Sequence, residues 1–166
     1  MKLDSDEYVF RTDYARAGLD IRPLLNFEGN LLIRGYNFGS SGAQQLADGS
    51  DPCRFTWRER DPSWQKSIAH TSTSREFFNM HATFVEVGVL LPEPKPLQIN
   101  HYRLRSKEEF HANKMHVKGS IGRNYVNVDF DALDALYSEV EDDHACHVAR
   151  QARDRWLQDR ESRAIH

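Results

Sequence analysis

Residues 99–110 read INHYRLRSKEEF and mark the clearest change of structure in the chain. The alternation of apolar and polar residues before this change predicts a strand over residues 97–102. A helix is predicted to begin at Ser106, because Ser106 and Glu109 have the spacing of a capping box and Phe110 adds an apolar face. A strand that leads directly into a helix indicates a fold of the α/β class.

The rest of the chain predicts a mixed sheet with flanking helices. Further strands are expected at residues 1–9, 30–36, 66–70, 77–80 and 83–90, and further helices at residues 131–137 and 143–160. Residues 47–62 are polar and contain Asp-Gly and Asp-Pro pairs, so they are expected to form a surface loop around an irregular strand. The 166 residues contain no repeat or linker, which predicts one domain, 1–166, that ends in a C-terminal helix within residues 140–166.

Composition and charge exclude several classes of protein. With 39% hydrophobic residues the chain can bury a core, and its net charge of -3 gives no electrostatic reason to bind nucleic acid or an anionic membrane. No apolar run approaches the ~20 residues that a membrane span needs. The two cysteines, Cys53 and Cys146, lack a paired spacing, which argues against a disulfide framework and favours a reducing compartment such as the cytoplasm. A membrane-associated location would apply if the chain is part of a longer enzyme.

The acidic motif Asp4-Ser5-Asp6 lies in the first predicted strand. Because side chains alternate along a strand, the two carboxylates are expected to point the same way, about 7 Å apart along the chain. Two carboxylates on one side offer oxygen ligands to a divalent cation, which takes its remaining ligands from water and substrate phosphates. The alternative is a solvated acidic strand end, which is the commoner explanation of a lone Asp-x-Asp.

Taken in order, several segments resemble the later part of a GT-A glycosyltransferase of the family 2/family 92-like group: LDSDEYV, GYNFGSSG, WQKSIAH, NMHATF, INHYRLRSKEEFHANKMHVKG and EDDHACHVAR. The resemblance spans roughly residues 1–150 and implies the metal- and acceptor-binding half of a GT-A fold. It implies metal-dependent transfer of a sugar from a nucleotide-sugar donor to a glycan or small carbohydrate acceptor. In this family the nucleotide-binding half precedes the Asp-x-Asp strand, so an upstream half-domain or a partner chain is expected to complete the enzyme.

The resemblance also implies a set of ligands for the metal and the donor. Mn²⁺ or Mg²⁺ would neutralise charge on the leaving diphosphate, with Asp6 as the direct ligand and Asp4 as a second ligand or a contact to the ribose. His101 is the candidate for a late histidine ligand, and a core or hydrogen-bonded histidine is an equally weighted alternative. Arg105 and Lys114 match the family signature beside a helix N-terminus and are predicted to bind the diphosphate. Their alternative role is solvated surface charge.

Candidates for the chemistry of transfer are less specific. Inverting transfer needs a base that removes a proton from the acceptor hydroxyl, and Asp51 and Asp61 are the candidates because both lie beside turn-forming prolines. Trp64 and Lys66 are expected to shape the acceptor pocket, since an aromatic face packs on a sugar ring. A buried tryptophan without a ligand is the alternative.

Other functions stay open at this point. A catalytically inactive fragment or binding module would keep the fold without transferring sugar. A metal-dependent phosphohydrolase would share Asp4, Asp6 and His101, and a partner-recognition domain would use the helix over residues 143–160. Zinc at residues 142–147 is disfavoured, because structural zinc usually has four ligands and the segment lacks paired cysteine motifs.

Overall fold

The main sheet of the computed structural model is mixed, which confirms the α/β class. The structure describes residues 3, 5–25, 30–46, 48–69, 74–77, 83–85, 88–90, 96–114 and 129–164. Neighbouring strands follow the order β1 (Glu7–Arg11), β8 (Leu97–His101), β2 (Asn30–Asn37) and β4 (Trp64–Ala69), and β7 (Gly88–Leu90) also pairs with β2. The β1–β8 and β2–β4 pairs are antiparallel, whereas β2 runs parallel to β8 and β7.

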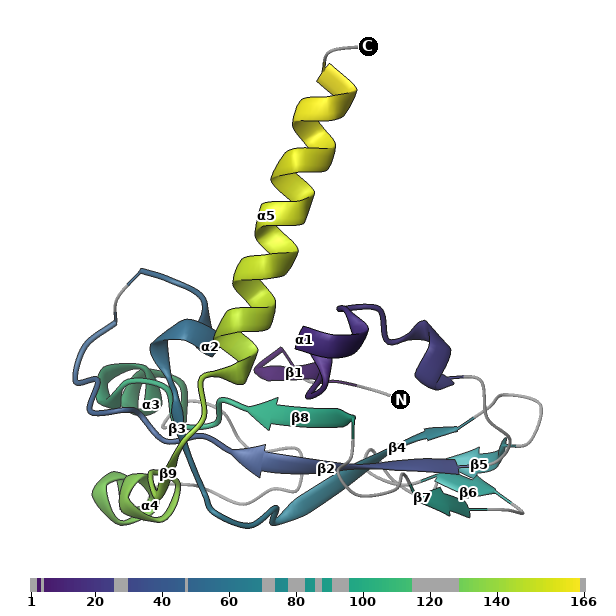
Figure 1. Ribbon diagram of the computed structural model, residues 1–166. Coiled ribbons are helices and arrows are strands. Elements are labelled where there is room, and N and C mark those ends of the chain that lie inside the picture. The colour runs from purple at the N-terminus through teal and green to yellow at the C-terminus, as the bar shows by residue number, and fades with distance from the viewer. Residues whose placement is uncertain are drawn as a thin grey trace.

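Five α-helices, one 3-10 helix and four short strands lie around this sheet in the described residues. They are α1 (Tyr14–Ala17), a 3-10 helix η1 (Arg22–Leu25), α2 (Asp51–Arg54), β3 (Trp57–Arg58), β5 (Ser74–Phe77), β6 (Thr83–Val85), α3 (Lys107–Lys114), α4 (Phe130–Leu136), β9 (Val140–Glu141) and α5 (His144–Ala164). Strands β3 and β9 pair with each other, as do β5 and β6. Figure 1 shows α2, α3 and α4 gathered at one end of the main sheet and α5 extending away from it. Within the described residues, none of the helices has the length and apolarity needed to cross a membrane.

One face of the main sheet carries the apolar core and, beyond it, the side chains of Glu7 and His101. The strand register places Val9 opposite Ile99 and Glu7 opposite His101, so these four side chains share a face. Apolar residues fill the middle of this face, each at most 2% exposed: Leu31, Ile33, Leu97 and Ile99. The polar side chains therefore lie at the end of the face, just beyond the core.

Two smaller clusters hold the helices at that end of the sheet. Phe38, Phe55 and Tyr102 form one, and the other contains Leu104, Phe110, Phe130 and Tyr137. The predicted capping box is confirmed, because Ser106 Oγ lies 2.7 Å from Glu109 Oε2 and the Glu109 N–H donates to Ser106 Oγ at 3.2 Å. The segment after β8 is thereby fixed between the two clusters.

Two predicted elements differ from the structure. Strand β1 begins at Glu7, and Asp6 lies in the turn before it, so the expectation that the Asp-x-Asp motif lies within a strand is wrong for Asp6. Residues 47–62 include the short helix α2, started by Pro52, and both Asp51 and Pro52 are buried. Polar composition suggested a surface loop, but the buried carboxylate of Asp51 is paired with Arg105 from a distant part of the chain and lies near Arg54 in its own helix.

Cys53 and Cys146 form a disulfide, so the prediction against one is wrong. Cys53 lies in α2 and Cys146 in the first turn of α5, with their Cα atoms 4.5 Å apart and a separation of 93 positions in sequence. A pair this distant has no spacing signal in the sequence, and only the fold brings it together. Because disulfides persist mainly in oxidising compartments, the preference for a reducing compartment loses its basis.

Candidate functional site

Asp6 and His101, two of the predicted metal ligands, lie side by side at the end of the main sheet. Glu7 pairs with His101 across β1 and β8, and the Tyr102 N–H donates to the Asp6 carbonyl at 2.9 Å. These contacts bring His101 Nε2 to 3.5 Å from Asp6 Oδ2, with the two side chains 21% and 24% exposed. A partly exposed carboxylate beside an imidazole can hold a proton between them or bind a cation.

The separation of the Asp6 and His101 donor atoms is compatible with two ligands of one divalent cation. Two ligand atoms about 2.1 Å from one ion would lie roughly 3–3.5 Å apart, which matches the observed separation. Asp4 lies outside the described residues. Among the residues that are described, no cluster of three or more His, Cys, Asp or Glu side chains is arranged to hold a metal. Water and substrate phosphates would therefore supply further ligands, as is usual for Mg²⁺ and Mn²⁺ at phosphate sites.

Arg105, a predicted diphosphate contact, lies in the segment between β8 and α3. Its guanidinium Nη2 is 2.8 Å from Asp51 Oδ2, and its backbone has a φ of 54°, which is uncommon for a residue with a side chain. Its Nε is buried and makes no hydrogen bond within the described part of the chain. Such strained residues persist where the surroundings hold them, and they concentrate at functional sites.

The predicted base Asp51 is engaged with two guanidinium groups. Arg105 lies 2.8 Å and Arg54 3.8 Å from its carboxylate oxygens. Burial raises the pKa of the Asp51 carboxyl, and the two arginines only partly offset this effect. In this arrangement the carboxylate holds Arg105 in place, and its role as a base stays a prediction.

Arg54 extends this arrangement to the cap of α3. Its guanidinium donates to Glu109 Oε2 at 3.0 Å, and Glu109 also accepts from Ser106. Burial acts to raise the pKa of Glu109, but the hydrogen bonds from Ser106 and Arg54 outweigh it and the pKa is lowered. Helix α2 therefore holds both Arg105 and the start of α3.

Tyr8, which the sequence analysis did not single out, connects the two parts of the site. It follows Glu7 on β1 and points to the opposite face, 39% exposed, with its ring 5.5 Å from that of Tyr102. Burial raises the pKa of the Tyr8 hydroxyl, and the charges of Asp51, Arg105 and Asp6 also act on it. The aromatic residue directly after an acidic motif was the available signal in the sequence.

Of the other predicted residues, Trp64 lies against His101, whereas Asp61 and Lys114 do not join this group in the described structure. Asp61 is exposed in a bend between β3 and β4, and Lys114 is the last residue of α3, with a side chain whose position is not described. Where the acidic segment enters α5, His144 Nδ1 is 3.0 Å from Asp142 Oδ1 and His147 Nε2 is 3.1 Å from Asp143 Oδ2. Those are two separate carboxylate–imidazole pairs.

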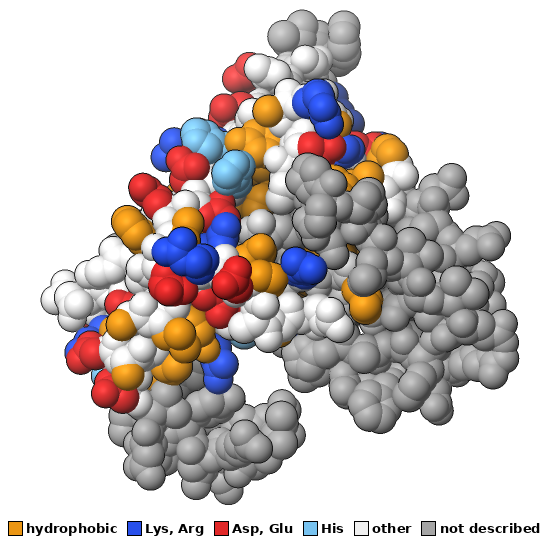
Figure 2. Space-filling model, turned by 60° about the horizontal axis from the view of Figure 1, so that its bottom comes forward, with side chains coloured by type: hydrophobic (Ala, Val, Ile, Leu, Met, Phe, Trp, Pro, Cys, Tyr) orange, Lys and Arg blue, Asp and Glu red, His pale blue; other side chains and the backbone are white. Residues whose placement is uncertain are grey.

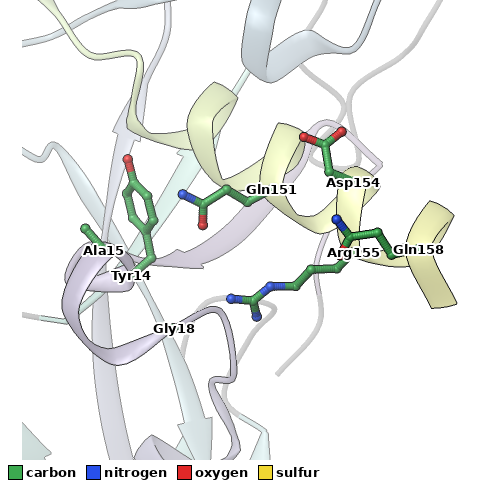
Figure 3. A pocket seen from close by; sticks show the side chains of 7 residues that line it. All are labelled: Tyr14, Ala15, Gly18, Gln151, Asp154, Arg155 and Gln158. Carbon is green, nitrogen blue, oxygen red and sulfur yellow. The ribbon is translucent and has the colours of Figure 1, made fainter.

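A polar hollow of about 530 Å³ lies between α1 and α5, apart from Asp6 and His101. Gln151 and Arg155 reach from α5 towards Tyr14 and Gly18 (Figure 3). Over the described part of the face in Figure 2, acidic, basic and histidine side chains are interspersed. The hollow shares no residue with the Asp6–His101 pair, so the end of the main sheet remains the candidate site.

Comparison with protein-family models, curated proteins and solved structures found no match to this chain.

Proposed function

We propose that this chain is the metal- and acceptor-binding part of a GT-A glycosyltransferase. It would transfer a sugar from a nucleotide-sugar donor to a glycan or small carbohydrate, with Mn²⁺ or Mg²⁺ as cofactor. The proposal rests on the sequence resemblance, and the observation that carries it furthest is the 3.5 Å approach of His101 Nε2 to Asp6 Oδ2. The resemblance implied these two residues as ligands of one cation, and the fold brings them within reach of one.

The surroundings of the pair suit a charged donor. Asp6 and His101 would hold the cation, which supplies charge neutralisation to a leaving diphosphate when it is bound. Arg105, held by Asp51, adds a cationic group whose guanidinium can bind phosphate oxygens in a bidentate manner. Tyr8 presents an exposed ring on the same strand, and such rings pack on sugars.

Two measurements test the proposal. Mn²⁺ is titrated into the protein while the imidazole NMR signals of His101 and His147 are followed, and we expect paramagnetic broadening to affect His101 first. The Asp143–His147 pair at the start of α5 is the matched control, because it is also a carboxylate beside an imidazole but both side chains are about half exposed. Broadening of both histidines at equal Mn²⁺ would contradict a specific site.

Sugar transfer is then measured with a panel of nucleotide-sugars and carbohydrate acceptors, with and without a chelator. Sugar transfer that the chelator abolishes supports a metal-dependent glycosyltransferase. Mn²⁺ and nucleoside-diphosphate binding at His101 without turnover would instead favour the binding module of the same fold, and turnover that is indifferent to the chelator would remove the metal from the proposal.

A further inference from the structure

A continuous set of contacts runs behind the Asp6–His101 pair. Lys66 on β4 forms a fully buried ion pair with Glu7, both side chains being 1% exposed. The Lys66 ammonium also lies 5.9 Å from the centre of the Trp64 ring. The Trp64 ring in turn contacts the His101 ring edge-on, with centroids 5.4 Å apart and planes at 77°. Four side chains from three strands thus connect the start of β1 to the end of β8.

Gly35 makes the Trp64–His101 contact possible. Strand β2 lies between β4 and β8, and Gly35 pairs with Trp64 on one side and Ile99 on the other. A Cβ atom at position 35 would lie 2.3 Å from Cε2 of Trp64, so the indole occupies the space that any other side chain would fill. The tryptophan therefore crosses β2 at its glycine and reaches the imidazole.

The buried ion pair fits a positioning role better than a stabilising one. Removing two charges from water is unfavourable, and their mutual attraction often does no more than offset that desolvation cost. Lys66 is long enough to reach Glu7 on β1 only by extending across the face of the sheet, which fixes its stem and ammonium beside Trp64. The position of the Trp64 indole is then fixed by two neighbours, Gly35 beneath it and Lys66 beside it.

We propose that Trp64 is a positioning residue that turns the His101 imidazole so that Nε2 faces Asp6, with Lys66 and Glu7 holding Trp64 in place. The rotation of a histidine ring about its last side-chain bond is broad and roughly two-fold, so an unsupported ring exchanges its two nitrogens. Partners of this kind behind a ligand typically change metal affinity 10- to 100-fold when they are removed. The value of the orientation for metal binding rests on the proposed function, whereas the orientation itself does not.

The test compares Trp64→Met, Trp64→Phe and wild type, with Trp156→Met as the control. Trp156 is an exposed tryptophan on α5, so its loss leaves His101 untouched. The first readout is the imidazole ¹⁵N spectrum of the metal-free protein, which reports the tautomer of His101. We expect one dominant tautomer in wild type and Trp156→Met, a mixture in Trp64→Met, and recovery towards wild type in Trp64→Phe, which keeps a ring edge.

The second readout is the Mn²⁺ affinity at His101, which should fall by about 10-fold or more in Trp64→Met. If Trp64→Met does not fold, the double variant Glu7→Gln/Lys66→Met removes the support of Trp64 while keeping side-chain volume, and a smaller shift in the same direction is expected. A His101 tautomer identical to wild type in every folded variant overturns the proposal. If wild type itself binds no Mn²⁺ at His101, the proposed function fails, and the metal-free tautomers still decide the role of Trp64.

Discussion

His101 Nε2 lies 3.5 Å from Asp6 Oδ2, at the point where two antiparallel strands from opposite parts of the chain meet. The two atoms are too far apart for a strong hydrogen bond and close enough to share a third partner. Their partial exposure leaves an approach for that partner. Binding of an ion at this position would tie β1 to β8 beyond their backbone ladder.

Replacing either member of the pair should weaken Mn²⁺ binding without unfolding the protein. Asp6→Asn removes a charged oxygen ligand and His101→Ala removes a nitrogen ligand, and each is expected to reduce affinity at least 10-fold, worth about 1.4 kcal/mol. Isothermal titration with Mn²⁺ gives the affinities, and urea unfolding gives the stability. Asp143→Asn and His147→Ala are the matched controls on α5. A large loss of stability with unchanged Mn²⁺ affinity would assign His101 to the core.

The disulfide should contribute strongly to stability because it closes a long loop. Cys53 and Cys146 are 93 positions apart, and the Cys53→Ala/Cys146→Ala variant should lose about 2–5 kcal/mol of unfolding free energy. Equilibrium urea unfolding of the oxidised wild type and the variant measures the difference. Addition of a dithiol reductant should lower the wild-type midpoint and leave the variant unchanged. Equal midpoints for oxidised wild type and variant would show that the bond adds no stability.

Local features of the fold could be predicted from the sequence, because the residues that cause them are neighbours. The Ser106–Glu109 cap and the helix that follows depend on a few adjacent positions, and both are found in the structure. The α4 helix was expected at residues 131–137 and is found at Phe130–Leu136. Strand β2 also begins at the residue expected.

Contacts that depend on strand order and register could not be predicted. The Glu7–Lys66 ion pair spans two intervening strands. The Trp64 ring occupies the space over Gly35 only because β2 pairs with β4. Helix α2 was missed because the burial of the polar Asp51 side chain involves Arg105, which is distant in sequence, as well as its neighbour Arg54. The approach of Asp6 to His101 was expected through the family resemblance alone, since nothing local relates the two residues.

Removing one member of the buried Glu7–Lys66 ion pair should destabilise the fold strongly, whereas replacing both members by neutral residues should change the unfolding free energy little. Lys66→Met leaves the Glu7 carboxylate buried without its ammonium partner, and we expect a loss of about 3–5 kcal/mol. Glu7→Gln/Lys66→Met removes both charges and should recover most of that loss, since an apolar or neutral pair of similar volume avoids the desolvation cost. Asp131→Asn, which breaks the exposed Lys107–Asp131 pair, is the control and should cost at most about 1 kcal/mol. Additive losses in the double variant would contradict this account.

Asp142 should make part of the stability dependent on acid pH. Burial acts to raise the pKa of its carboxyl, but the hydrogen bond from Arg58 Nε at 2.6 Å and a further one from Gln98 outweigh this, and the pKa is lowered. A carboxyl whose pKa is lower in the folded state stabilises the fold fully above the unfolded pKa of about 3.9, and this stabilisation is lost as the pH falls through the folded pKa. Asp142→Asn should therefore be less stable than wild type at pH 6, and the difference should shrink as the pH falls below about 4.

Urea midpoints at pH 6 and pH 3 measure the effect, with Asp143→Asn as the exposed neighbour that should change little at either pH. A stability difference between Asp142→Asn and wild type that is the same at both pH values would mean that the Asp142 charge does not contribute to folding.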